Sequence, residues 1–242
     1  MTSVSRGLAP EVAAFEVSAG DPPAVSRWAD GAAKRVLDVV VAGPLAIATL
    51  PLLVVLCSVS ALVFRANPLF TQDRIGRDGQ RFRFVKVRSL APSVPADIDK
   101  YALAIQPLGR WGRFVRRTHL DELPQLWLVL AGHMSLVGPR PELPAIAATF
   151  DQAFVERRTT VRPGITGVWQ VGDGAAELIG ESPDFDDLYL RAASLRLDVW
   201  VMWRTVAGAL GAPPVSIDDC RRVAGTGTGP VTSGTPEPST ER

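Results

Sequence analysis

The uncharged stretch from Val39 to Phe64 constrains the fold of this chain more than any other feature. As one α-helix it would be roughly 39 Å long, enough to cross a bilayer core of about 30 Å. Pro51 lies near the middle and divides the stretch into halves of about 13 residues, each too short to span. Two arrangements remain open: a kinked transmembrane helix, which lipid tolerates, or a re-entrant helix-break-helix within one leaflet.

Basic residues flank this stretch at both ends. Arg27, Lys34 and Arg35 precede it, and Arg65 and Arg74 are among the arginines that follow it. Basic residues mark the cytoplasmic side of a membrane segment, so both flanks are expected on that side. The flanks therefore favour the re-entrant arrangement, with Pro51 at the break, over the spanning helix.

Composition divides the chain into four segments. Residues 1–33 begin without clear periodicity and are expected to form a flexible tail. Residues 34–66 would form the membrane hairpin and residues 67–222 a cytosolic domain. Residues 223–242 are rich in Gly, Thr, Pro and Ser and are expected to be disordered. The net charge of +1 argues against nucleic acid as a partner.

A short β-hairpin is expected directly after the membrane segment. Phe82 and Phe84 alternate with arginines after the turn signal Asp78-Gly79. Lys86 and Arg88 continue this strand. A basic strand face can be solvated, can contact lipid headgroups, or can bind a substrate phosphate.

Helical periodicity dominates the remaining sequence. Residues 108–117, 143–157 and 197–210 each carry an apolar stripe, which predicts amphipathic helices at the membrane interface or against the core. The expected fold class is therefore α/β, mostly helical, with the hairpin as its main sheet element.

Adjacent carboxylates, Asp121 and Glu122, stand just before an apolar run. Pro124 is tolerated only in a first helical turn, so a helix is expected to begin near Leu120 or Asp121. Free N–H groups at a helix start favour anions. Taken alone, the pair could be an N-cap and its neighbour.

Rigid arginines near the acids favour a second interpretation. Pro139 and Pro141 enclose Arg140 between two rings that fix φ, and Arg162 precedes a Pro-Gly turn. A guanidinium held in one pose suits the binding of a phosphate. Arg116 lies shortly before the acids. Two carboxylates among such arginines suit a metal ion and a polyphosphate better than they suit a cap.

Several motifs, in order along the chain, resemble those of the bacterial sugar transferases. These are monotopic phosphoglycosyl transferases that start glycan assembly on a polyprenyl phosphate. The motifs are Lys34-Arg35-Val-Leu-Asp38, Arg116-Arg-Thr-His-Leu-Asp-Glu-Leu-Pro-Gln-Leu126, Met134-Ser-Leu-Val-Gly-Pro-Arg-Pro141, and Arg162-Pro-Gly-Ile-Thr-Gly167 followed by Trp169-Gln-Val171. The resemblance covers roughly two thirds of the chain and corresponds to the compact form of the family.

The resemblance implies a reaction and a role for each site residue. Asp121 would attack the β-phosphorus of a UDP-sugar, release UMP, and pass the phosphosugar to undecaprenyl phosphate. Glu122 would hold Mg²⁺. The residues expected to bind substrate phosphates, or to brace those that do, are Lys86, Arg88, Arg116, Pro139, Arg140, Pro141 and Arg162.

The resemblance also implies a place in the cell. The protein would sit in one leaflet of the inner membrane, at its cytoplasmic face, through a re-entrant helix-break-helix. It would catalyse the first membrane step of exopolysaccharide, capsule or glycoprotein glycan synthesis. The sequence does not identify the sugar, and it leaves assembly into a homo-oligomer open.

Departures from the family pattern keep two alternatives open. Leu50-Pro51 replaces the usual Ser-Pro break, and Gly172-Asp173-Gly174 replaces a Gly-Arg pair that would bear on nucleotide or sugar contacts. The protein could be a non-catalytic membrane-anchored interaction protein on the same scaffold, although Asp121 and Glu122 are retained. It could also be a membrane metal-dependent phosphohydrolase with water as the acceptor. His119 has no partner at metal-ligand spacing and is expected to be incidental.

Overall fold

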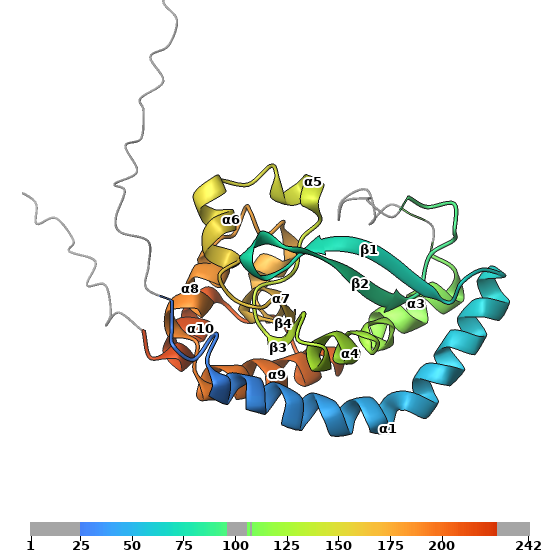
Figure 1. Ribbon diagram of the computed structural model, residues 1–242, viewed down its shortest axis with the longest axis horizontal. Helices are drawn as coiled ribbons and strands as arrows, with labels where there is room; N and C mark the ends of the chain where they lie inside the picture. The colour runs from blue at the N-terminus through green and yellow to red at the C-terminus, as the bar shows by residue number, and fades with distance from the viewer. Residues whose placement is uncertain (1–24, 96–105, 107, 227–242) are drawn as a thin grey trace, which may run out of the picture.

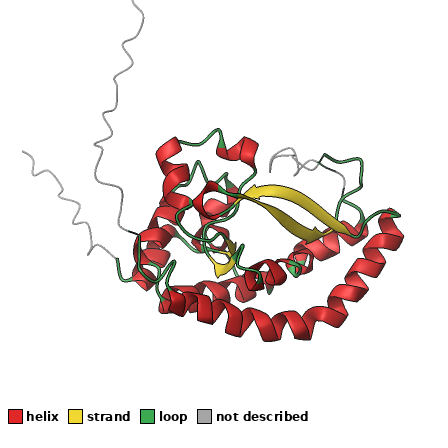
Figure 2. Cartoon of the chain, in the orientation of Figure 1, coloured by secondary structure: helices red, strands yellow, loops and turns green. Residues whose placement is uncertain are grey.

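The computed structural model describes residues 25–95, 106 and 108–226. Within that part of the chain helices predominate, with two small two-stranded sheets, as expected for a mostly helical α/β fold (Figures 1 and 2). The helices are α1 (Ala32–Phe64), α3 (Arg110–Arg117), α4 (Gln125–Leu130), α5 (Pro144–Ala147), α6 (Gln152–Arg158), α7 (Val168–Val171), α8 (Asp184–Ala192), α9 (Leu195–Ala209) and α10 (Ile217–Ala224). The strands are β1 (Leu69–Ile75), β2 (Arg81–Val87), β3 (Ser135–Val137) and β4 (Gly164–Thr166), and the 3-10 turns are η1 (Arg77–Gly79), η2 (Leu120–Glu122) and η3 (Asp173–Ala176).

Helix α1 is bound to the rest of the protein at both of its ends. Near its start, Lys34 Nζ donates to the Asp198 carboxylate of α9 at 2.7 Å. Near its end, Ser60 Oγ donates to the Arg88 carbonyl at 2.9 Å, and Leu56 packs into the apolar cluster under β2 and α3. Figure 1 shows α1 curving along one side of the molecule between these two attachments. By length and composition it is the one described helix that could cross a membrane.

The expected break at Pro51 is not a break in the helix. Helix α1 runs continuously for 33 residues through both Pro44 and Pro51. A proline removes one helical hydrogen bond and its ring pushes against the preceding turn, which bends a helix without necessarily ending it. The expectation of two separate helices is therefore corrected to one curved helix. Its outward face exposes large apolar side chains, among them Val40 and Ile47.

The predicted hairpin is confirmed. Strands β1 and β2 pair antiparallel, from Leu69 opposite Val87 to Ile75 opposite Arg81. Asp78 and Gly79 make the turn at φ of 54° and 71°, the left-handed region that turn residues tolerate. The hairpin thus places the basic residues of β2 beside the turn that carries the two acids.

A second sheet was not predicted, and it joins the two proline-containing motifs. Strands β3 and β4 pair in parallel, with Ser135 opposite Gly164. A Cβ atom on Gly138 would lie 2.6 Å from the Arg162 carbonyl oxygen, and one on Gly164 would lie 2.2 Å from the Gly138 nitrogen. Only glycine permits backbones to approach this closely. The motif glycines therefore bring the two segments side by side.

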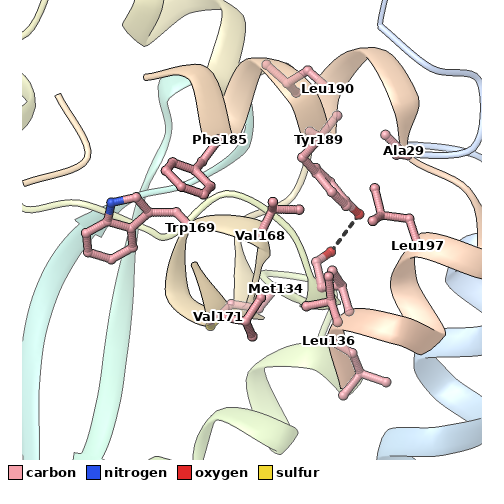
Figure 3. Packing of buried hydrophobic residues seen from close by; sticks show 14 of the residues in the cluster. Ala29, Met134, Leu136, Val168, Trp169, Val171, Phe185, Tyr189, Leu190 and Leu197 are labelled. Carbon is pink, nitrogen blue, oxygen red and sulfur yellow. Dashed lines mark hydrogen bonds between the residues drawn. The ribbon is translucent and has the colours of Figure 1, made fainter. Parts of the chain in front are cut away.

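The core lies between this small sheet and helices α7, α8 and α9 (Figure 3). The hydroxyl of Tyr189, in α8, donates to the Val137 carbonyl at 3.0 Å and to Asp198 at 3.1 Å. Trp28 Nε1 donates to the same Asp198 carboxylate at 2.7 Å. Residues 25–31, which the sequence assigned to the N-terminal tail, are thus packed against α8 and α9. The rest of that tail, and most of residues 223–242, lie outside the described residues.

Two helical expectations change in detail. Residues 143–157 form two helices, α5 and α6, because the Asp151 carboxylate accepts from the Phe154 N–H at 2.9 Å and caps a new helix. Helix α3 buries Val115 against α1 and β2, so its apolar stripe faces the core. Helix α9 instead leaves Trp203 and Val206 about 60% exposed.

Candidate active site

Asp121 and Glu122 occupy the 3-10 turn η2, which leads into α4. Pro124 lies at the N-cap of α4, close to the helix start predicted from the sequence. No side-chain cap hydrogen bond is made at η2 or α4 in this described stretch. The N-cap interpretation of Asp121 therefore has no support. Asp121 is 4% exposed, and His119 before it adopts a left-handed φ of 55°.

A basic pocket lies beside the two acids. The structure brings four of the predicted cations to it: Lys86 and Arg88 from the β2 strand and its end, Arg116 from α3, and Arg140. This cavity has a volume of about 90 Å³. Arg116 Nε donates to Ser89 Oγ at 3.0 Å, which fixes one wall. Residues separated by more than fifty positions thus form one site for a polyanion.

The two carboxylates differ in their electrostatics. Burial raises the pKa of Asp121 above its usual range, with the Glu122 charge adding to the effect and Lys86 and Arg116 opposing it. Burial would also raise the pKa of Glu122, but Lys86, which forms an ion pair with it, and Arg140 outweigh burial and hold that pKa below its ordinary value. Glu122 is therefore a stable anion, whereas Asp121 is a less stabilised and more basic carboxylate. The more basic carboxylate, that of Asp121, is the one suited to attack an electrophile.

The backbone of Pro139–Pro141 is fixed on every side. All three carbonyls accept hydrogen bonds, at 2.7 to 2.9 Å, from β4, α6 and β1. Pro139 and Pro141 thus act on the backbone, as their restricted φ predicts. The Arg140 guanidinium lies 6.0 Å from the centre of the Trp169 ring, and it lines both the basic pocket and the groove described next.

A larger groove, which was not predicted from the sequence, also adjoins Glu122. Its volume is about 610 Å³, and Glu122, Arg140 and His119 line one end. The remaining lining is mostly apolar and comes from α1, α4, α9 and the two short strands. Sequence could have given only one signal for it, the apolar pattern of α9, because its walls come from five separate segments.

Arg162 is placed away from both cavities. Its Nη1 forms an ion pair with Asp30 at 3.1 Å, and its Nε donates to the Gly132 carbonyl at 3.1 Å. Arg77 pairs with the same Asp30 carboxylate at 2.6 Å. The position of Arg162 therefore supports a structural role at the start of β4, whereas a phosphate-binding role was expected.

Comparison with known proteins decides the family. Residues 29–212 match the family described as bacterial sugar transferase. The chain belongs to the bacterial sugar transferase family. The matched residues include α1, the two acids, the basic pocket and the groove.

Three relatives show how much of a longer protein this chain matches. It is 36% identical to a UDP-galactose-lipid carrier transferase of Erwinia amylovora, covering 73% of this chain and 40% of that protein. It is 36% identical to an undecaprenyl-phosphate glucose phosphotransferase of Komagataeibacter xylinus, covering 75% of this chain and 36% of that protein. It is 34% identical to a UDP-glucose:undecaprenyl-phosphate glucose-1-phosphate transferase of Caulobacter vibrioides, covering 84% and 78%. The chain thus spans about 40% of the first two relatives and most of the third.

The donor set of this family member fits Mg²⁺ only together with a substrate. Among the described residues, no group of three or more His, Cys, Asp or Glu side chains could hold a metal ion. Mg²⁺ commonly binds through one or two carboxylates and completes its coordination with water and substrate phosphates. Asp121 and Glu122 supply such a pair beside a pocket suited to phosphates.

The loop that departs from the family pattern, Gly172-Asp173-Gly174, packs against α8. A Cβ atom on Gly172 or Gly174 would lie 2.4 Å from the Phe185 ring, so both glycines are required by packing. Asp173 between them is exposed and lines neither the basic pocket nor the groove. In the described structure, none of the three residues Gly172, Asp173 and Gly174 therefore lines the basic pocket or the groove.

Proposed function

We propose that this protein is a phosphoglycosyl transferase that moves a phosphosugar from a UDP-sugar to undecaprenyl phosphate. The observation that carries the proposal is the pair Asp121 and Glu122, with opposite pKa shifts, beside a pocket of converging cations. The names of two relatives support it: both contain undecaprenyl phosphate, and that of the Caulobacter vibrioides relative also contains UDP-glucose.

In the first half-reaction the donor diphosphate binds in the basic pocket, against Lys86, Arg88, Arg116 and Arg140. The Asp121 carboxylate attacks the β-phosphorus, forming an acyl phosphate bond as the bond to the UMP oxygen breaks. Negative charge develops on the departing UMP oxygen, and the fixed guanidinium of Arg140 is positioned to stabilise it. Mg²⁺, held by Glu122 and the substrate phosphates, would neutralise part of the diphosphate charge.

In the second half-reaction the lipid phosphate attacks the same phosphorus. The acyl phosphate bond breaks, the Asp121 carboxylate is restored, and undecaprenyl-diphospho-sugar leaves. One phosphoanhydride has replaced another, so the overall equilibrium lies near neutrality and later steps must draw it forward. We place this reaction at the first membrane step of exopolysaccharide, capsule or glycoprotein glycan synthesis.

The attachment of α1 supports a position in one leaflet. Contacts at Lys34 and at Ser60 tie both ends of the helix to the same body. A helix crossing the bilayer along its normal would carry one end away from that body. We therefore propose that α1 enters and leaves by the cytoplasmic face of the inner membrane, with its apolar outer face in lipid.

The test is UMP release from single UDP-sugars by the purified full chain with Mg²⁺. The transferase predicts multiple turnovers only when undecaprenyl phosphate is present, and no turnover by Asp121→Asn. Multiple turnovers without lipid would show instead a phosphohydrolase that uses water. No UMP from any donor, with or without lipid, would favour the non-catalytic scaffold.

A further inference from the structure

The groove beside Glu122 has two chemically different ends. Its polar end carries Arg140, Glu122 and Gln170, and both amide atoms of Gln170 are buried without a hydrogen-bond partner among the described residues. Its other end lies between α1 and α9. There the lining is mostly apolar, from Val41, Leu45, Met202, Val206, Gly208 and Ala209, and α9 adds the polar side chains of Arg204 and Thr205.

We propose that this groove binds the isoprenoid chain of the polyprenyl phosphate acceptor, with the lipid phosphate at Arg140. The nucleotide-sugar donor then occupies the basic pocket. The inference rests on the proposed function and deepens it, because it assigns each substrate to its own cavity.

The two cavities differ in the polarity of the residues that line them. The basic pocket presents Arg74, Lys86, Arg88 and Arg116 in addition to Arg140, which suits the two phosphates of a donor. The groove presents mostly hydrocarbon along its length, and an isoprenoid chain gains free energy by leaving water there. A sugar or nucleobase would leave most of its hydrogen-bonding groups unpaired against the same walls.

The position of the groove agrees with a ligand that arrives from lipid. Val41 and Leu45 belong to the helix whose outer face is apolar and exposed, and Val206 is itself 61% exposed. The apolar end is therefore continuous with the exposed apolar faces of α1 and α9. A volume of about 610 Å³ lies within the range of roughly 300–1,000 Å³ that is usual for small-molecule sites.

Arg140 can contact the phosphates of both substrates. It lines both cavities, so a phosphate at either site meets the same guanidinium. Glu122 lines the groove, and Asp121, its neighbour in η2, has its largest cationic influence from Lys86 of the basic pocket. UMP would thus depart into the basic pocket, and the lipid phosphate, arriving from the groove, would attack at the position that the UMP oxygen leaves, opposite the Asp121 oxygen.

Gly208 offers a direct test of this assignment. It lines the groove, and a Cβ atom there would have no neighbour within 4 Å, so a side chain can start from this wall of the groove without a clash at its first atom. We compare Gly208→Trp with Leu210→Trp, a matched substitution on the same helix end. Leu210 is 85% exposed and does not line the groove.

Two readouts on the full chain in detergent keep the inference separate from the proposed function. The first is the equilibrium binding of undecaprenyl phosphate, followed by native mass spectrometry. The second is the covalent adduct formed from a UDP-sugar without lipid. Gly208→Trp is expected to weaken lipid binding by about tenfold, the change expected when roughly two methylene groups lose their burial. It should form the adduct at the wild-type rate, and Leu210→Trp should change neither readout.

Three results would overturn the assignment. Unchanged lipid binding by Gly208→Trp would show that the chain lies elsewhere. Slower adduct formation with unchanged lipid binding would place the nucleotide in the groove. Equal weakening by both variants would assign the effect to the outer surface of α9. Absence of an adduct in the wild type, with lipid binding still lost in Gly208→Trp, would reject the proposed chemistry while the groove assignment stands.

Discussion

Replacing Lys34 with methionine is expected to lower the free energy of unfolding by about 3–5 kcal/mol. The side chains of Lys34 and Asp198 are 4% and 0% exposed, and their charged atoms lie 2.7 Å apart. Without the ammonium group the Asp198 carboxylate keeps only the neutral donors Trp28 and Tyr189. Leaving this carboxylate charge buried without its partner would therefore remove a large part of a total free energy of unfolding of about 5–15 kcal/mol.

The double variant Lys34→Met/Asp198→Asn separates the charge from the packing. The carboxamide introduced by Asp198→Asn is neutral: its oxygen can accept from Trp28 Nε1, and its NH2 can donate to the Tyr189 hydroxyl, which still donates to the Val137 carbonyl. The double variant should therefore recover more than half of the loss. Urea unfolding in detergent micelles, followed by tryptophan fluorescence and circular dichroism, measures the free energy of unfolding of the single and the double variant. As a control, Arg221→Met removes a pair whose side chains are 41% and 75% exposed, and it should cost under about 0.5 kcal/mol. A cost below about 1 kcal/mol for Lys34→Met, or a double variant no more stable than the single one, would refute the reasoning.

Three further substitutions test other parts of the account. Lys86 lowers the pKa of Asp121, which must be ionised to attack. In Lys86→Gln, the pH below which adduct formation slows should therefore rise, and the rate should fall by roughly 10²-fold. If that pH does not change, Lys86 does not set the pKa of Asp121 in the reaction. Pro51→Ala restores a helical N–H and should straighten α1, so spin labels at the exposed Val36 and Leu62 should move apart in pulsed electron resonance; an unchanged distance would assign the curvature to the end contacts. Gly174→Ala would place a Cβ 2.4 Å from the Phe185 ring and should lower stability by about 1–3 kcal/mol, with the folded fraction forming adduct at the wild-type rate; a slower rate per folded molecule would give this loop a direct role.

Local pattern was sufficient where one segment determines its own structure. Alternating Phe82 and Phe84 after Asp78-Gly79 predicted the hairpin, since turn chemistry and period act within a few residues. Pro124 predicted a helix start near Leu120 or Asp121; a 3-10 turn begins at Leu120, and the α-helix itself begins at Gln125. The length of the apolar stretch predicted a long helix there.

Pattern was insufficient where distant segments decide the structure. Strands β3 and β4 have three residues each, too few to show a period, and close glycine packing joins them. Arg162 looked like a phosphate ligand beside Pro163, but the partner that engages it, Asp30, is 132 positions away. Pro51 predicted a break, but α1 continues through it, and the partners that tie both ends of α1 to the same body are distant in sequence. The groove could not be predicted from the sequence for the same reason, because its apolar walls meet only after folding.

The central claim is that Asp121 carries the phosphosugar during the reaction. Intact-protein mass spectra of the full chain, mixed with Mg²⁺ and single UDP-sugars without lipid, test it most directly. The account predicts a mass gain of one phosphosugar in the wild type, no gain in Asp121→Asn, and loss of the gain when undecaprenyl phosphate is added. The size of the gain would also identify the sugar class. A folded wild-type protein that gains no mass with any UDP-sugar, or an Asp121→Asn variant that still gains it, would contradict the account.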